Sequence, residues 1–196
     1  MKPYGWPLLA LVAVIQTGVL GKIVWDRDRL LKTGREIALP VTPVDPRDVM
    51  RGDYVILGYD ITQIPLPSAT ESSNLGAVRR GDAVFVTLQP TPDRGWLVTG
   101  LANEYPAQAA TGEVVLKGRV THAPPLDVRA PSTAGQKISV HYGIERYFVP
   151  EGTGGKLEAD VREKKIQAIV AIGPDGTAAI KGLMIDGQRH EAPPLL

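Results

Sequence analysis

Few residues of this chain combine the types and the spacing that catalysis requires. The three histidines are far apart in the sequence and include no His-x-x-x-His pair: His122, His141 and His190. A serine–lysine pair would suit hydrolysis of an acyl bond, yet the first serine, Ser68, follows a proline-rich stretch. Ser139 and Lys137 are two apart on one predicted strand, a layout that does not by itself pair a nucleophile with a base. We therefore predict no catalytic residues, no metal and no cofactor.

Carboxylates and glycines offer two further kinds of site. The pairs Asp45/Asp48 and Glu145/Glu151 would suit acid–base chemistry if folding brought them together, although charges on strands and loops are normally solvated. Residues 151–155 (EGTGG) precede a predicted helix, and a glycine-rich loop there can hold an anion. The G-x-x-x-x-G-K-[ST] string of phosphate loops is absent, so a flexible turn is the better interpretation.

The composition excludes several classes of protein. Gly and Pro make up about 19% of the 196 residues, against roughly 12% in average usage. The absence of cysteine excludes a disulfide scaffold, and the net charge of +1 gives no basic surface for nucleic acid. Hydrophobic residues at 43% are too many for a wholly disordered chain. A chain of short elements joined by many turns remains, of a size that suits one domain.

The N-terminal segment predicts a membrane anchor. Between Trp6 and Trp25 the polar side chains are Gln16, Thr17 and Lys22. As a helix the two tryptophans would lie about 29 Å apart, close to the thickness of a bilayer core of about 30 Å. A cleaved signal peptide would need small residues at a cleavage site beside the apolar stretch, and a buried helix of a soluble domain would need a polar face. Neither feature is present, and an uncleaved anchor at residues 1–25 is preferred.

Charge and layout disagree about which side of the membrane holds the rest of the chain. The cations on the C-terminal side of the span outnumber those before it, which by the positive-inside rule places the C-terminal part in the cytoplasm. A short tail before an apolar span is also how a signal anchor begins, and a signal anchor exports the chain on its C-terminal side. Residues 26–38 are charged and are predicted as a juxtamembrane linker whose helical part ends at Gly34.

The rest of the chain, residues 39–196, is predicted as a β-rich soluble domain. Short β-type runs are bounded by turn residues: 54–61, 83–88, 96–99, 112–120, 137–149 (one strand, or two around Gly143), 166–172 and 177–185. Gly173-Pro-Asp-Gly predicts a hairpin between the last two. Segment 157–165 fits a short amphipathic helix, and 64–75 and 123–135 are predicted loops. The expected fold is mainly β, an antiparallel sandwich or partly open barrel with one or two short helices.

One motif has a recognisable pattern. Residues 52–59 read GDYVILGY, which fits G-D-Y-x-x-L-x-Y at every defined position. With the preceding DPRDVMR and the later YGIERYFVPEG of residues 142–152, the chain resembles the GDYXXLXY family of bacterial proteins over most of its length after the anchor. The resemblance implies a small membrane-anchored protein, often encoded beside multi-pass membrane proteins, and implies no established activity. It also favours an exported domain.

Two interpretations of the motif stay open. On a strand, alternation places Leu57 and Tyr59 on one face as core neighbours, with Tyr54 on the other. The motif then serves packing, with each phenol held by one hydrogen bond, or it presents a surface for a partner or ligand. The residues predicted for binding or interaction, drawn from the two family-like segments, are Arg51, Gly52, Asp53, Tyr54, Leu57, Tyr59, Glu145, Tyr147 and Glu151.

These observations predict a non-enzymatic, single-pass protein of the bacterial inner membrane with an extracytoplasmic, periplasmic β-domain. Its expected partners are the lipid bilayer, through the N-terminal helix, and a multi-pass membrane protein; nucleic acid is not expected. Two alternatives are a membrane-anchored hydrolase with the layout of a signal peptidase, and a module that binds lipid or glycan of the cell envelope.

Overall fold

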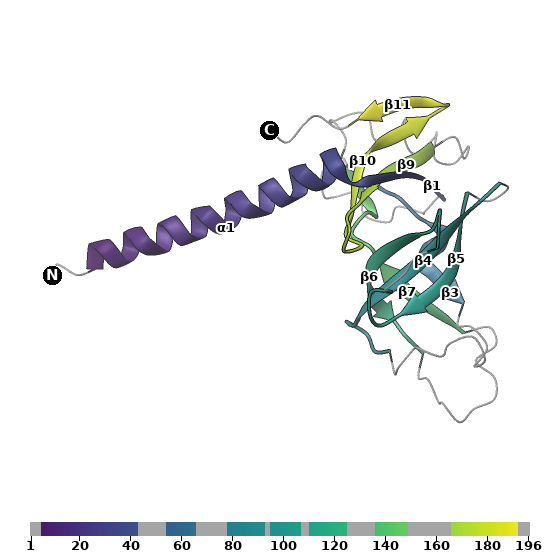
Figure 1. The fold of residues 1–196 in the computed structure, drawn as a ribbon, viewed down its shortest axis with the longest axis horizontal. Helices are drawn as coiled ribbons and strands as arrows, with labels where there is room; N and C mark the ends of the chain where they lie inside the picture. The colour runs from purple at the N-terminus through teal and green to yellow at the C-terminus, as the bar shows by residue number, and fades with distance from the viewer. Residues whose placement is uncertain are drawn as a thin grey trace.

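The computed structural model describes residues 5–42, 54–65, 78–92, 95–106, 110–124, 136–148 and 166–191. One long helix leads into a domain of strands (Figure 1). In chain order the elements are α1 (Gly5–Thr33), β1 (Arg35–Pro40), β2 (Tyr54–Ile56), the 3-10 helix η1 (Asp60–Thr62), β3 (Gln63–Pro65), β4 (Ala83–Thr91), β5 (Gly95–Ala102), β6 (Val114–His122), β7 (Lys137–His141), β8 (Arg146–Phe148), β9 (Ile166–Ile172), β10 (Ala178–Ile185) and β11 (Gln188–Glu191).

Helix α1 projects from the domain along most of its length (Figure 1). Its side chains from Trp6 to Trp25 are exposed, and the apolar stretch is long enough to cross a membrane. The helix ends as predicted, because the Gly34 N–H donates to the Leu30 carbonyl at 2.9 Å and β1 starts at the next residue. The segment predicted as a juxtamembrane linker therefore contains the last helical turns and the start of the first strand.

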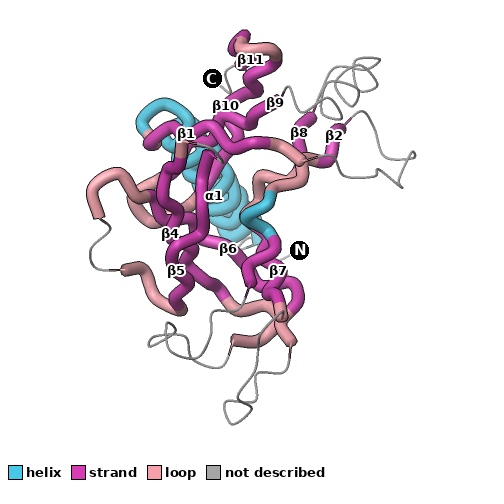
Figure 2. Tube along the Cα trace, turned by 90° about the vertical axis from the view of Figure 1, so that its right-hand side faces the viewer, coloured by secondary structure: helices cyan, strands magenta, loops and turns pink. Residues whose placement is uncertain are grey.

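The strands form two larger antiparallel sheets and one short ribbon. The four-stranded sheet has the order β1-β9-β10-β11, the five-stranded sheet β3-β7-β6-β4-β5, and the ribbon pairs β2 with β8. The chain leaves the four-stranded sheet after β1 and returns to it at β9, so the first and the last strands of the domain share one sheet (Figure 2). The strands make a nearly closed barrel, and the mainly β, antiparallel class is confirmed.

One hydrophobic core fills the space between the sheets. Strand alternation places Val84, Val86 and Leu88 of β4 inside, and all three are fully buried. Leu39 of β1 contributes to the same core from the other sheet. A backbone hydrogen bond of 2.8 Å from the Lys117 N–H to the Gly176 carbonyl joins β6 to the turn between β9 and β10, so the two sheets are also linked through the backbone.

Most of the predicted strands are present. The runs at 83–88, 96–99, 112–120, 166–172 and 177–185 became β4, β5, β6, β9 and β10, and the run at 137–149 is two strands separated at Gly143, whose φ is +80°. The Gly173–Gly176 turn joins β9 to β10 as predicted, with hydrogen bonds from the Gly173 N–H to the Thr177 carbonyl and from the Gly176 N–H to the Gly173 carbonyl.

Three local predictions were incomplete or wrong. The run at 54–61 is not one strand, because the chain changes partners: Ile56 pairs with β8, Thr42 donates to the Gly58 carbonyl, and η1 comes next. The loop predicted at 64–75 begins inside β3. Strand β11 was not predicted, although Asp186-Gly187, both with positive φ, is a hairpin signal. The helix predicted at 157–165 lies outside the described residues.

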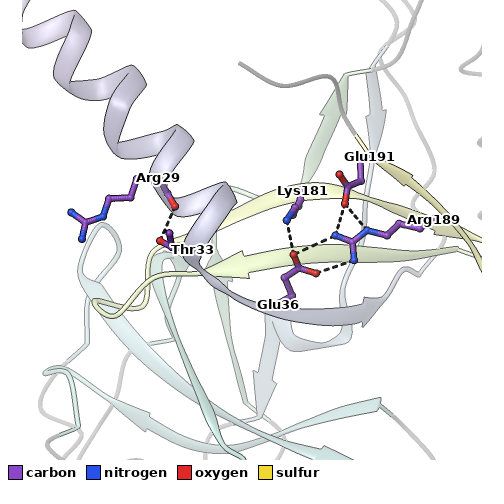
Figure 3. Close-up of polar contacts among 6 residues, drawn as sticks. All are labelled: Arg29, Thr33, Glu36, Lys181, Arg189 and Glu191. Carbon is purple, nitrogen blue, oxygen red and sulfur yellow. Dashed lines mark hydrogen bonds and ion pairs between the residues drawn. The ribbon is translucent and has the colours of Figure 1, made fainter. Parts of the chain in front are cut away.

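A charged cluster on the outer face of the four-stranded sheet connects three of its strands (Figure 3). Glu36 of β1 lies opposite Ala171 of β9, whose small side chain lets the carboxylate extend over it toward β10 and β11. There Glu36 Oε1 lies 2.6 Å from Lys181 Nζ and Oε2 lies 2.9 Å from Arg189 Nη1. Hydrogen bonds from Arg189, and then from Lys181, lower the pKa of Glu36 from 4.5 to about 2.

We expect this cluster to make stability depend on acid pH. The folded pKa of Glu36 is depressed, so its contribution is complete above about pH 4.5 and is lost as the pH falls from about 4.5 toward 2. The Glu36 side chain is 36% exposed, and solvent screening limits the contribution to about 0.5–1 kcal/mol. Urea unfolding at pH 6 and pH 2 should show Glu36→Gln less stable than wild type at pH 6 and close to wild type at pH 2. Glu104→Gln, at an exposed position, is the control, and equal losses at both pH values would contradict the prediction.

Candidate functional site

The two family-like segments lie side by side, although about 90 residues separate them in sequence. Strand β2 pairs with β8 in the register Tyr54 opposite Phe148, Val55 opposite Tyr147 and Ile56 opposite Arg146. The pairing continues one residue further, where the Leu57 N–H donates to the Glu145 carbonyl at 2.9 Å. The structure therefore brings several of the predicted interaction residues into one ribbon.

Leu57 and Tyr59 lie in the core, as strand alternation predicted. Leu57 is 0% exposed and Tyr59 is 3% exposed. The Tyr59 hydroxyl donates to the Ile144 carbonyl at 2.8 Å. Burial, helped by the negative charge of Glu145, raises the pKa of the Tyr59 phenol well above its ordinary value of 10, so it stays a neutral donor. For these two motif residues the burial agrees with the packing interpretation.

Tyr142 makes the reciprocal bond and was not among the predicted site residues. Its hydroxyl donates to the Ile61 carbonyl at 2.8 Å, and its ring is buried. Each segment thus supplies a buried phenol that satisfies a backbone carbonyl of the other. The sequence shows a tyrosine directly before Gly143. The backbone carbonyl to which its hydroxyl donates depends on the fold. We call Tyr59, Tyr142, Ile61 and Ile144 the phenol pair cluster.

Glu145 holds the turn that carries Tyr142 and Ile144. Its Oε1 accepts from the Tyr142 N–H at 2.6 Å, and its Oε2 accepts from the Gly143 N–H at 2.9 Å. His141 Nε2 lies 3.0 Å from the same Oε2. With 14% of its side chain exposed, Glu145 directs its acceptors mainly to this turn. Among the described residues no group of three or more metal-ligating side chains includes it.

The remaining predicted site residues are only partly described. Tyr147 is half-buried against the core, and burial raises the pKa of its phenol. Tyr54 is placed by its backbone in β2, while Arg51, Gly52, Asp53 and Glu151 lie outside the described residues. Residues 80–82 repeat the RGD sequence of residues 51–53, and they form a turn in which the Arg79 N–H donates to Asp82 Oδ2 at 2.8 Å.

The cavity that the described residues leave beside the phenol pair cluster is small. A cavity of about 20 Å³ lies between β1, η1 and β5, lined in part by Tyr59, Asp60 and Trp96. A cavity needs roughly 10–15 Å³ to hold one water, so this one has room for a single water molecule. Within the described part of the chain, the phenol pair cluster is a structural centre that joins two segments.

A second arrangement, at the junction of α1 with the domain, was not anticipated from the sequence. Arg27 Nη1 donates to the Ala178 carbonyl at 3.3 Å, which ties the helix to β10. Beyond the helix, Arg35 donates through Nη1 to the Glu113 carbonyl at 2.7 Å and through Nη2 to the Gly112 carbonyl at 2.8 Å. These bonds fix the direction in which the helix leaves the domain, because they act on both sides of Gly34.

Comparison with known proteins gives one match. A family model described as GDYXXLXY protein matches residues 16–183, from the middle of α1 into β10. No curated protein and no solved structure matches the chain. The matched range covers most of the 196 residues and includes both segments of the phenol pair cluster and the helix–domain junction.

Proposed function

Because the chain belongs to the GDYXXLXY protein family, we propose that it is a single-pass membrane protein whose β-domain serves an integral-membrane partner as a non-enzymatic accessory module. The observation that carries the proposal is the junction of α1 with the sheet. An apolar helix, uncovered by the described chain, continues without a linker into a folded domain. Such a junction holds the domain at a defined position beside the bilayer, which suits a protein that acts next to another membrane protein.

The described residues of the two family-like segments have structural roles, which is compatible with a non-enzymatic module. Leu57 and Tyr59 specify the packing of the domain, and Glu145 specifies a turn. For the hydrolase alternative, the relevant serine is Ser139, whose hydroxyl lies 3.0 Å from the Gln63 amide nitrogen Nε2. Among the described residues no base is paired with that hydroxyl, so no observation favours hydrolysis over an accessory role.

Crosslinking in native membranes tests the accessory role. A photo-crosslinking residue at Val19, exposed on α1, should form an adduct with a multi-pass membrane protein. A matched variant in which residues 8–20 become a leucine–alanine helix of equal length keeps the anchor and should lose that adduct. Adducts only with lipid or with a second copy of the chain, or an adduct that survives the helix replacement, would contradict the proposal.

We further propose that the β-domain is extracytoplasmic, on the outer side of the bacterial inner membrane. A signal anchor and the family resemblance support this side, against the distribution of positive charge. A reporter enzyme that is active only outside the cytoplasm, fused after Leu196, should be active. A reporter active only in the cytoplasm, fused at the same place, should be inactive; the reverse pair of results would place the domain inside.

A further inference from the structure

A cleft of about 640 Å³ separates the last turns of α1 from the turn between β9 and β10. Asp26, Arg29 and Thr33 are among the residues that line it from the helix, and Asp175 and Thr177 line it from the turn. Sites for small ligands typically measure about 300–1,000 Å³ and place a few polar groups at defined positions. The cleft is of that size and carries both signs of charge, and the accessory role proposed above makes no use of it.

The position of the cleft along the helix places it at the membrane surface. This step rests on the proposed membrane anchoring, with Trp25 at the edge of the hydrocarbon core. At a rise of about 1.5 Å per residue, Arg29 lies about 6 Å beyond Trp25. The headgroup layer on each side of a bilayer is about 5–7 Å thick. The cleft therefore opens at the level of the lipid headgroups.

The guanidinium of Arg29 is available to a ligand. The two acidic residues beside it on α1 are already paired, Asp26 with Lys22 and Asp28 with Lys32. Within the described ranges Arg29 has no ion pair, and in Figure 3 its side chain extends from α1 away from the Glu36 cluster. An unpaired arginine at headgroup level attracts a phosphate group.

The carboxylate of Asp175 supplies the opposite charge. Its Oδ2 accepts from the Thr177 hydroxyl at 2.7 Å, and its Oδ1 accepts from the Thr177 N–H at 3.1 Å. The hydroxyl bond is the main reason that the pKa of Asp175 lies below its usual range, with Lys117 adding in the same direction, so the group is ionised at neutral pH. Each carboxylate oxygen keeps a further lone pair for another donor.

We propose that this cleft binds a phospholipid headgroup that carries a primary ammonium group, with the phosphate at Arg29 and the ammonium at Asp175. A primary ammonium has three N–H donors for the carboxylate, whereas the trimethylated ammonium of a choline headgroup has none. An anionic glycerol headgroup would satisfy Arg29 and leave Asp175 facing a polar group without positive charge. The pair of charges therefore selects for phosphoethanolamine.

The test uses the full chain in detergent micelles with equal amounts of phosphatidylethanolamine, phosphatidylcholine and phosphatidylglycerol that share the same acyl chains. Native mass spectrometry counts the lipids retained. Wild type should retain phosphatidylethanolamine over phosphatidylcholine by up to about fivefold, the range expected for one accessible charge pair. Asp175→Asn, which keeps the Oδ1 acceptor of the turn, should remove that preference. Arg29→Gln should lower retention of all three, and Arg80→Gln, at an exposed turn outside the cleft, should behave as wild type.

Equal retention of the three lipids by wild type, or a preference that survives Asp175→Asn, would overturn the headgroup site. These outcomes leave membrane anchoring intact, because lipid is still retained. Failure of the wild-type chain to retain any phospholipid or to float with lipid vesicles would instead contradict the anchoring, and with it the headgroup site. Circular dichroism of each variant confirms that it is folded before its lipids are counted.

Discussion

Replacing Tyr59 by alanine is expected to lower the free energy of unfolding by about 3–5 kcal/mol, the range for removing a buried aromatic side chain. The ring is 3% exposed in the core, and its hydroxyl satisfies the Ile144 carbonyl. The substitution removes the apolar contacts of the ring and leaves that carbonyl without its donor. Urea unfolding of the full chain in detergent, followed by circular dichroism, measures the change.

Phenylalanine variants separate the hydroxyl from the ring. Tyr59→Phe and Tyr142→Phe each remove one hydroxyl of the phenol pair cluster, and each should cost about 1–2 kcal/mol because a buried carbonyl loses its donor. Tyr105→Phe, at a position 43% exposed, is the control and should change stability by less than about 0.5 kcal/mol. If Tyr59→Ala unfolded like wild type, the motif would not have this structural role.

Replacing Gly34 by alanine is expected to loosen the junction of α1 with the domain and to destabilise the protein by about 1–3 kcal/mol, the cost of inserting a methyl group where no space exists. A Cβ at Gly34 would lie 2.6 Å from the Leu30 carbonyl oxygen and 3.1 Å from both Ala171 Cβ and the Ile172 nitrogen. Two of these three atoms belong to the backbone, so they cannot move aside by changing a rotamer. Either the helix end or β9 must shift.

Hydrogen exchange locates that effect. In Gly34→Ala, amides of the β9–β10 turn should exchange faster than in wild type, because α1 packs against both strands and Arg27 donates to the Ala178 carbonyl. Gly21→Ala is the matched control, since a Cβ at Gly21 has no atom within 4 Å. Unchanged exchange in the turn of Gly34→Ala would show that the junction tolerates the methyl group and does not hold the helix rigidly.

The elements that could be predicted are those specified by neighbouring residues. Alternation and flanking turn residues located β4, β6, β9 and β10, and Gly34 and Gly173 marked a helix end and a hairpin. The prediction was wrong at residues 54–61, where alternation continues but the strand does not, because the hydrogen-bond partners change from β8 to Thr42. A sequence pattern reports the face of a residue and carries no information about its partner strand.

In the candidate site, too, the burial of side chains could be predicted from the sequence, whereas their hydrogen-bond partners could not. Alternation placed Leu57 and Tyr59 together on a buried face, and the structure confirms it. The bonds from Tyr59 to Ile144 and from Tyr142 to Ile61 span 85 and 81 residues, and no local pattern indicates them. Glu145 was predicted as an interaction residue because it lies in a family-like segment. In the structure its carboxylate accepts from the Tyr142 and Gly143 N–H groups, an arrangement that depends on the turn that it closes.

Residue types and their spacing within about 20 residues are enough to predict the apolar helix, the mainly β class and the family motif. The folded structure is needed to show that motif residues Leu57 and Tyr59 are core residues, that Arg27 ties α1 to β10, and that a cleft with Arg29 on one side and Asp175 on the other lies at that junction. These features depend on contacts between residues more than 80 positions apart. Such contacts form only when burial of the whole core offsets the entropy lost in bringing distant segments together.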